Sequence, residues 1–256
     1  MFELDYQKKI GEITAWLQET VHKAGFQDVI VAVSGGVDSA VTLHLAAKAL
    51  GPEHVHAVML PYGTMSEKHT QDAKAVIERA GLPQNNVYLY DIQAAADGIM
   101  GEIPQEEHIR RGNIMARVRM MYLYDLSKKH NALVVGTENK SEYYLGYFTR
   151  FGDEASDIEP IRSLYKTQIW EMARALGVPD QVIAKAPTAG LWEEQTDEKE
   201  FGFSYQDADR ILYHFFEEKL PEEGIVALGL PKGLVDKVLQ RVKQNEFKHH
   251  LPHVFV

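Results

Sequence analysis

The sequence predicts an α/β protein in which helices cover both faces of a parallel β-sheet. Short apolar runs that read as buried strands alternate along the chain with longer helical patterns. Segments rich in glycine and polar residues follow three of these strands, and an open parallel sheet binds its ligands at such strand ends. A chain of 256 residues can bury one substantial core. We therefore expect residues 1–256 to form a single domain, with a helical region from about 206 to 256.

Four runs have the character of strands buried on both faces, because they are short, apolar and without polar alternation. They cover residues 29–33, 55–60, 87–91 and 132–137.

Helical periodicity separates and follows these strands. An amphipathic helix is expected over residues 5–24, with Ile10, Ile13, Leu17 and Val21 on one side. The other helices are expected over 37–50, 67–80, about 106–129, 164–176, about 206–219 and 231–246. Residues 146–163 are expected to form a loop, and 186–206 a long irregular segment of the kind that is usually functional or mobile.

Composition narrows the classes of function. The chain has no cysteine, which excludes disulfides, thiolate metal sites and a cysteine nucleophile. Its net charge of −10 counts against nonspecific nucleic-acid binding, which needs a basic face. No stretch is long and apolar enough to span a bilayer, and residues 1–5 lack the pattern of a signal peptide. We expect a cytoplasmic protein with no membrane or nucleic-acid partner.

The most informative segment is Ser34-Gly35-Gly36-Val37-Asp38-Ser39, between the first strand and its helix. Such a turn aims backbone N–H groups and hydroxyls at one point, in front of a helix N-terminus, and this suits a phosphate or pyrophosphate. The two glycines lack the Cβ atoms that would hold an anion away. Asp38 is placed to ligate Mg²⁺. The turn is not a Walker loop, because the chain contains no G-x-x-x-x-G-K-[ST].

This turn resembles the pyrophosphate-binding loop of the ATP pyrophosphatases, and later segments resemble one family among them, the NAD synthetases. These segments are Gly136-Thr137-Glu138-Asn139-Lys140-Ser141-Glu142, Gly146-Tyr147-Phe148-Thr149-Arg150-Phe151-Gly152-Asp153 with Asp157 and Pro160, Leu164-Tyr165-Lys166-Thr167-Gln168, Pro187-Thr188-Ala189 and Gln195-Thr196-Asp197-Glu198. The resemblance runs from Ser34 to Lys248 and implies the adenine nucleotide alpha hydrolase-like, Rossmann-like fold. We expect the ammonia-dependent form, since the chain has no room for an amidohydrolase domain and no cysteine to cleave glutamine.

The resemblance implies an ATP-dependent amidation of deamido-NAD⁺ to NAD⁺. The nicotinate carboxylate would attack the α-phosphorus of ATP to give an acyl adenylate and pyrophosphate, and ammonia would then displace AMP. Mg²⁺ on the phosphate oxygens would neutralise charge during the first step.

The resemblance also implies roles for individual residues. The ATP-binding set is Ala32, Val33, Ser34, Gly35, Gly36, Val37, Asp38, Ser39, Thr137, Lys166 and Thr188. Asp38 and Glu142 would hold Mg²⁺, and Lys166 would stabilise charge on the phosphates. Asp153 would hold ammonium and accept its proton. The deamido-NAD⁺ set is Arg117, Arg150, Asp157, Phe247 and Lys248.

Two residues of the dinucleotide set depart from the family pattern. Arg150 stands where lysine is common, and a planar guanidinium places its donors differently. Phe247 stands where histidine is common, so one polar contact is lost or replaced by stacking. The aromatic cluster Tyr143, Tyr144, Tyr147 and Phe148 can equally serve a substrate ring, the core or a subunit interface.

Other functions stay open at this point. One is another amide-forming or base-modifying ATP pyrophosphatase, such as a GMP-synthetase-like or tRNA-modifying enzyme, and another is a non-catalytic ATP-binding module of the universal-stress-protein kind. The resemblance further implies a homodimer, to which the helix around Tyr122 and Tyr124 could contribute.

Overall fold

The structure is a computed structural model that describes residues 4–63, 67–192 and 194–250. Thr64, which ends the polar segment expected after the second strand, lies outside the described residues, as do residues 1–3 and Glu193. In the described part of the chain, no helix has the length and apolarity needed to cross a lipid bilayer.

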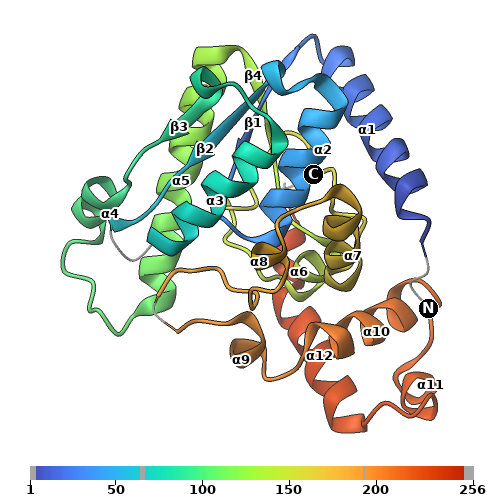
Figure 1. The fold of residues 1–256 in the computed structure, drawn as a ribbon. Helices are drawn as coiled ribbons and strands as arrows, with labels where there is room; N and C mark the ends of the chain where they lie inside the picture. The colour runs from blue at the N-terminus through green and yellow to red at the C-terminus, as the bar shows by residue number, and fades with distance from the viewer. Residues whose placement is uncertain (1–3, 64–66, 193, 251–256) are drawn as a thin grey trace, which may run out of the picture.

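Four parallel strands form one sheet in the order β3-β2-β1-β4 (Figure 1). Their bounds are β1 (Asp28–Ala32), β2 (Val55–Met59), β3 (Val87–Leu89) and β4 (Ala132–Val135). Val29 pairs with Val55 on one side and with Leu133 on the other. The α/β fold with a parallel sheet is therefore confirmed, although each strand ends one or two residues before its expected end.

Helices cover both faces of the sheet, as expected. The alternate β1 residues Val29 and Val31 pack with α1 (Tyr6–Lys23), α2 (Val37–Leu50) and α7 (Lys166–Leu176). Ile30 faces the other way, toward α4 (Gln93–Met100) and α5 (His108–His130). Because successive side chains of a strand point to opposite faces, one apolar run supplies both cores.

Several short helices were not expected from the sequence. They are α4, α6 (Lys140–Leu145), α8 (Asp180–Ile183), α9 (Asp197–Phe201) and α11 (Glu222–Ala227). The expected α3 (Glu67–Ala80), α10 (Tyr205–Phe216) and α12 (Lys232–Asn245) are present. The segment expected to be irregular from 186 to 206 thus contains α9 and the start of α10, and this expectation is wrong in part.

A separate apolar cluster joins the C-terminal helices to the end of α6 and the start of α7. Leu145, Tyr205, Ile211 and Val238 are among its fully buried members. In Figure 1 the orange and red helices α10, α11 and α12 lie together at one end of the molecule. This cluster supports the start of α7, which carries Lys166.

The strand order creates a crevice between β1 and β4. The chain runs from β1 to β2 and β3 on one side, and then returns to place β4 on the other side of β1. At such a switch point, the segments that follow the two strands diverge and leave room for a ligand. The Ser34–Ser39 turn follows β1, and the segment from Gly136 to Glu142 follows β4.

Candidate active site

Two serines hold the Ser34–Ser39 turn in shape. Ser39 Oγ donates to the carbonyl of Gly36 at 3.0 Å and lies 3.1 Å from Ser34 Oγ. The backbone N–H of Gly36 donates to Ser34 Oγ at 3.2 Å. Gly36 caps α2 without a side chain, so the start of that helix stays open to a ligand.

Asp38, Glu142 and Lys166 meet at the crevice. Lys166 Nζ lies 2.5 Å from Asp38 Oδ2 and 3.2 Å from Glu142 Oε1. The three side chains come from the starts of α2, α6 and α7, which are far apart in the sequence. The sequence predicted that these residues would lie in one site, and the structure brings them together.

Asn139 connects the two carboxylates. As N-cap of α6, its Oδ1 accepts the backbone N–H of Glu142 at 2.9 Å, and its Nδ2 donates to Asp38 Oδ1 at 2.9 Å. Sequence reasoning assigned Asn139 no role. An asparagine three residues before a glutamate is the signal of a capping box, and it could have predicted this helix start.

Asp209, on α10, fixes the start of α7. Its carboxylate accepts hydrogen bonds from Ser141 Oγ at 2.5 Å and from the N–H and hydroxyl of Thr167 at 2.9 and 2.8 Å. Ser141 Oγ in turn accepts the N–H of Lys166 at 2.8 Å. The C-terminal helices therefore position Lys166, and no sequence pattern pointed to Asp209.

In this cluster, burial and the neighbouring charges shift the pKa of a side chain in opposite directions. Burial raises the pKa of Glu142 to about 8, and the Lys166 ammonium acts against that rise. Burial also disfavours the charged form of Lys166, but Asp38 and Glu142 outweigh it, so the pKa of Lys166 is raised. Lys166 is thus a permanent cation at neutral pH.

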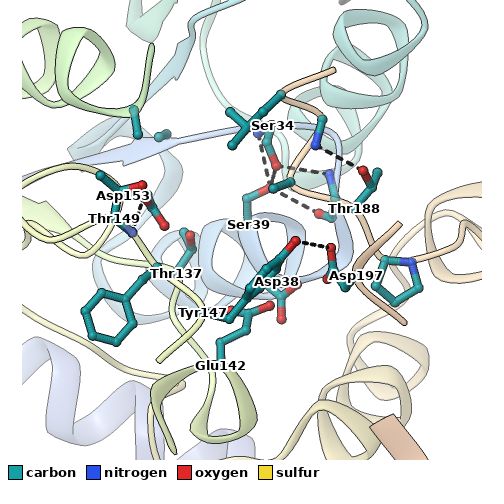
Figure 2. A pocket seen from close by; sticks show the side chains of 18 of the residues that line it. Ser34, Asp38, Ser39, Thr137, Glu142, Tyr147, Thr149, Asp153, Thr188 and Asp197 are labelled. Carbon is teal, nitrogen blue, oxygen red and sulfur yellow. Dashed lines mark hydrogen bonds between the residues drawn. The ribbon is translucent and has the colours of Figure 1, made fainter. Parts of the chain in front are cut away.

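The cluster opens into a cavity of about 540 Å³. Figure 2 shows Ser34, Ser39, Asp38, Glu142, Thr137 and Thr188 around it. Of the residues predicted for the site, the following line the cavity: Ala32, Val33, Ser34, Gly36, Val37, Asp38, Ser39, Thr137, Glu142, Asp153, Lys166, Thr188 and Lys248. A cavity of this size accommodates a ligand as large as a nucleotide.

Asp153 lines the same cavity on the side of Thr149 (Figure 2). Its Oδ1 accepts the N–H of Thr149 at 3.0 Å, and Thr149 Oγ1 bonds to Asn113 at 2.8 Å. Burial raises the pKa of Asp153, and hydrogen bonds from Thr149, together with the Arg119 guanidinium, partly offset the rise. A carboxylate with a raised pKa is a better proton acceptor than a free one.

Asp197, at the start of α9, is a further buried carboxylate in the cavity that sequence reasoning left without a role. It accepts hydrogen bonds from the hydroxyls of Tyr147 and Tyr205 at 3.1 and 3.0 Å. Burial raises the pKa of Asp197, while the nearby Lys166 lowers it. Tyr147 is therefore tied into the cavity wall by its hydroxyl (Figure 2).

Four of the five residues assigned to the dinucleotide do not line the cavity. Arg117 donates to the carbonyl of Arg150, and Arg150 Nη1 lies 3.5 Å from the carbonyl of Phe247. Asp157 accepts the N–H of Val134 at 2.8 Å and so ties a loop to the sheet. Lys248 does line the cavity, where its ammonium donates to the carbonyls of Gly146 and Phe148.

Fold and site together define a protein of the adenine nucleotide alpha hydrolase type, with an acidic pair and a lysine facing a serine-glycine turn. Comparison with known proteins identifies the family. Residues 9–252 match the family model described as NAD synthase. This chain belongs to the NAD synthase family.

Individual relatives agree with that assignment over nearly their whole lengths. The chain is 43% identical over 249 residues to the NH(3)-dependent NAD(+) synthetase of Chlorobium phaeobacteroides, covering 97% of this chain and 89% of the relative. The solved NMN synthetase of Francisella tularensis superposes with a TM-score of 0.85 at 31% identity, covering 98% of this chain and 99% of the other. The NH3-dependent NAD synthetase of Campylobacter jejuni gives a TM-score of 0.83 at 30% identity, covering 99% and 100%.

Proposed function

We propose that this chain is a C–N ligase that uses ATP and ammonia to amidate deamido-NAD⁺ to NAD⁺, releasing AMP and pyrophosphate. The observation that supports it most is the meeting of Asp38, Glu142 and Lys166 in a cavity that also receives the Ser34–Ser39 turn. A carboxylate becomes a good electrophile only when its oxygen is made a leaving group, and adenylation does this.

The donor set fits Mg²⁺ shared with a nucleotide. In the described part of the chain, no three His, Asp or Glu side chains are grouped to hold a metal. Two carboxylates alone suit Mg²⁺, which commonly takes one or two protein carboxylates, several waters and phosphate oxygens. Asp38 and Glu142 would hold the ion, which neutralises phosphate charge and polarises the phosphorus.

The chain's own groups divide the remaining work. The N–H groups and hydroxyls of the turn would bind phosphate oxygens at the start of α2. Lys166 would add positive charge where pyrophosphate departs. Asp153, whose pKa burial raises, would orient ammonium and accept its proton before the nitrogen attacks the acyl carbon. Thr137 and Thr188 line the cavity and would contact ATP.

A second substrate is supported by a specific observation. Of the five residues assigned to deamido-NAD⁺, only Lys248 lines the cavity. The described cavity wall therefore offers one of those five contacts to the part of a dinucleotide that lies beyond its nicotinate nucleotide. One similar structure is named an NMN synthetase. Amidation of nicotinate mononucleotide is therefore our second candidate.

We further propose a homodimer that completes the dinucleotide site. The large apolar side chains of Ile109, Met121, Phe151 and Phe247 are each at least half exposed. Phe247 and Phe151 flank the Arg150 backbone contact with Arg117. Large exposed apolar side chains beside substrate residues are typical of an interface between subunits. Light scattering should report twice the chain mass of 29.0 kDa.

Two further expectations, on location and on domain organisation, complete the proposal. We propose a cytoplasmic location, as expected from the sequence. We also propose that residues 1–256 act as one domain, because Tyr147, which packs with the C-terminal cluster, and Asp197, which accepts a hydrogen bond from Tyr205 of that cluster, line the same cavity as the turn after β1.

The test is AMP and pyrophosphate release with Mg²⁺, ATP and ammonium. Deamido-NAD⁺, nicotinate mononucleotide and xanthosine monophosphate are supplied in separate arms, with a further arm that omits the acceptor. We expect release that depends on deamido-NAD⁺, with NAD⁺ formed in equal amount. Dependence on the mononucleotide supports the second candidate, and dependence on xanthosine monophosphate supports a GMP-synthetase-like enzyme. ATP binding without release in any arm would instead identify a non-catalytic module.

A further inference from the structure

Lys185, just after α8, lies beside the Ser34–Ser39 turn, and the proposed function gives it no role. Its ammonium lies 2.7 Å from Asp72 Oδ2 and 3.1 Å from His69 Nδ1, both on α3. It also lies 3.5 Å from the carbonyl oxygen of Gly35. The Lys185 side chain is only 16% exposed and lines the cavity.

The same part of α3 presses directly on Gly35. This glycine has φ +79°, and a Cβ built on it would lie 2.3 Å from the carbonyl oxygen of His69 and 3.1 Å from the N–H nitrogen of Ala73. Gly35 itself faces α3 and is not part of the described cavity wall. One turn of helix α3 therefore leaves no room for a side chain on Gly35. The same part of α3 supplies His69 and Asp72, the two residues that hold Lys185.

The contact with the carbonyl fixes the orientation of a peptide group. The described peptide bonds are all trans, so the C=O of Gly35 and the N–H of Gly36 point in opposite directions. Lys185 holds the oxygen on the α3 side, and Ser34 Oγ accepts the N–H of Gly36. A flipped peptide would aim its oxygen at a bound anion and repel it. At 3.5 Å the contact is long for a hydrogen bond, so the Lys185 ammonium acts mainly by electrostatic attraction to the carbonyl dipole of Gly35.

We propose that Lys185 is a positioning residue of the phosphate-binding turn, which keeps the Gly35–Gly36 peptide in the orientation that accepts a phosphate chain. The Lys185–Asp72 pair adds no net charge, so the effect is one of orientation. Lys185 also directly precedes the segment that brings Thr188 and Leu191 to the cavity. The ligand class rests on the proposed function, in which ATP is bound and pyrophosphate released.

The test measures binding of magnesium pyrophosphate to the full chain by calorimetry, which needs no turnover. Lys185→Gln should weaken binding by about tenfold, a loss of about 1.4 kcal/mol. Lys185→Arg keeps a cation at the carbonyl and should retain most of the affinity. In turnover assays, the KM for ATP should rise in Lys185→Gln while the KM for the nicotinate substrate stays unchanged.

Lys237→Gln is the matched control. Lys237 Nζ donates at 3.1 Å to the carbonyl of Gly202, another glycine with positive φ, but neither residue lines the cavity. This variant should bind pyrophosphate as the unaltered chain does. Equal weakening in both lysine variants would show a general loss of fold and would overturn the proposal.

A double variant separates positioning from simple charge balance. If Lys185 served only to neutralise Asp72, then Asp72→Asn combined with Lys185→Gln would restore pyrophosphate binding, and the proposal would fall. Under our proposal the double variant stays weakened, because the carbonyl still lacks its cation. If the unaltered chain binds pyrophosphate but amidates nothing, the proposed function fails, whereas the positioning role is still decided by these affinities.

Discussion

Lys166 Nζ lies 2.5 Å from Asp38 Oδ2, inside the pair of carboxylates proposed to hold Mg²⁺. The same ammonium is 3.2 Å from Glu142 Oε1. A lysine thus compensates two carboxylates that would otherwise be buried without a counter-charge. A metal ion that binds these oxygens must therefore compete with Lys166.

This competition makes the effect of Lys166→Met specific. Removing the ammonium frees both carboxylates, so affinity for Mn²⁺ or Mg²⁺ without nucleotide should increase. Turnover should fall by about 100-fold or more, since charge stabilisation of this kind contributes that much. Calorimetry with the metal alone and steady-state assays measure the two effects. Lys232→Met, which breaks an exposed pair with Asp236, should change neither quantity. Unchanged or weaker metal binding in Lys166→Met would contradict the competition.

Gly35→Ala should damage both stability and phosphate binding. A side chain here meets the backbone of α3 at 2.3 Å and also requires a strained positive φ. Gly81→Ala isolates the second effect, because Gly81 has φ +75° and nothing within 4 Å of its Cβ position. Overpacking costs about 1–3 kcal/mol, so the free energy of unfolding in urea should drop by that much more for Gly35→Ala than for Gly81→Ala. Equal losses would mean that α3 moves aside freely.

Asp209→Ala should slow the enzyme although Asp209 does not touch the cavity. The change leaves the N–H and hydroxyl of Thr167 and the hydroxyl of Ser141 without their acceptor. Unpaired buried donors lower the free energy of unfolding by about 2–4 kcal/mol in total, measured in urea. Turnover at saturating substrate should fall because the start of α7, which carries Lys166, loses its anchor. Asp207→Ala on the same helix removes only the hydrogen bond that Ser204 Oγ donates to the Asp207 carboxylate, and should leave turnover unchanged.

The parts of the fold that local patterns predicted are those with strong periodicity. The apolar stripe from Ile10 to Val21 predicted α1 to within one residue at each end, and the apolar run beginning at Val29 predicted β1. Short helices were missed because four to eight residues give too few turns for a periodic pattern, and some contain glycine or follow proline. α4 contains Gly98, and α11 starts directly after Pro221. Such helices depend on tertiary packing more than on propensity.

The site residues also fall into two groups, those that local sequence patterns predicted and those that they did not. Asp38 and Glu142 stand in motifs that can be read locally, and the structure brings them to one crevice. Asp209 and Lys185 reach the site across 68 and 150 positions of sequence, from Ser141 and from Gly35. No spacing rule encodes those contacts, because they follow from how helices pack on the sheet and on one another.

Glu138 provides a test of pH dependence away from the glycine turn. Its side chain is 4% exposed and pairs with Arg162 Nη2 at 2.7 Å, while the same nitrogen lies 3.2 Å from Glu159. Burial raises the pKa of Glu138 to about 9, and Arg162 only partly offsets it. Burial likewise raises the pKa of Glu159 to about 7. One guanidinium thus serves two buried carboxyls, and the folded protein holds protons that the unfolded chain releases.

Stability should therefore fall as pH rises from about 4.5 to about 9, because over this window Glu138 is protonated when folded and ionised when unfolded. One such group contributes a slope of at most about 1.4 kcal/mol per pH unit. Glu138→Gln removes the group and leaves Arg162 paired with Glu159, so the variant should match the unaltered chain near pH 5 and exceed it in unfolding free energy at pH 8.5. Urea denaturation at both pH values measures this. Glu12→Gln, at an exposed carboxylate whose pKa is lowered by the hydrogen bond from Lys9, should show no such gain. If the gain in unfolding free energy of Glu138→Gln over the unaltered chain is no larger at pH 8.5 than at pH 5, then Arg162 keeps Glu138 ionised in the folded state.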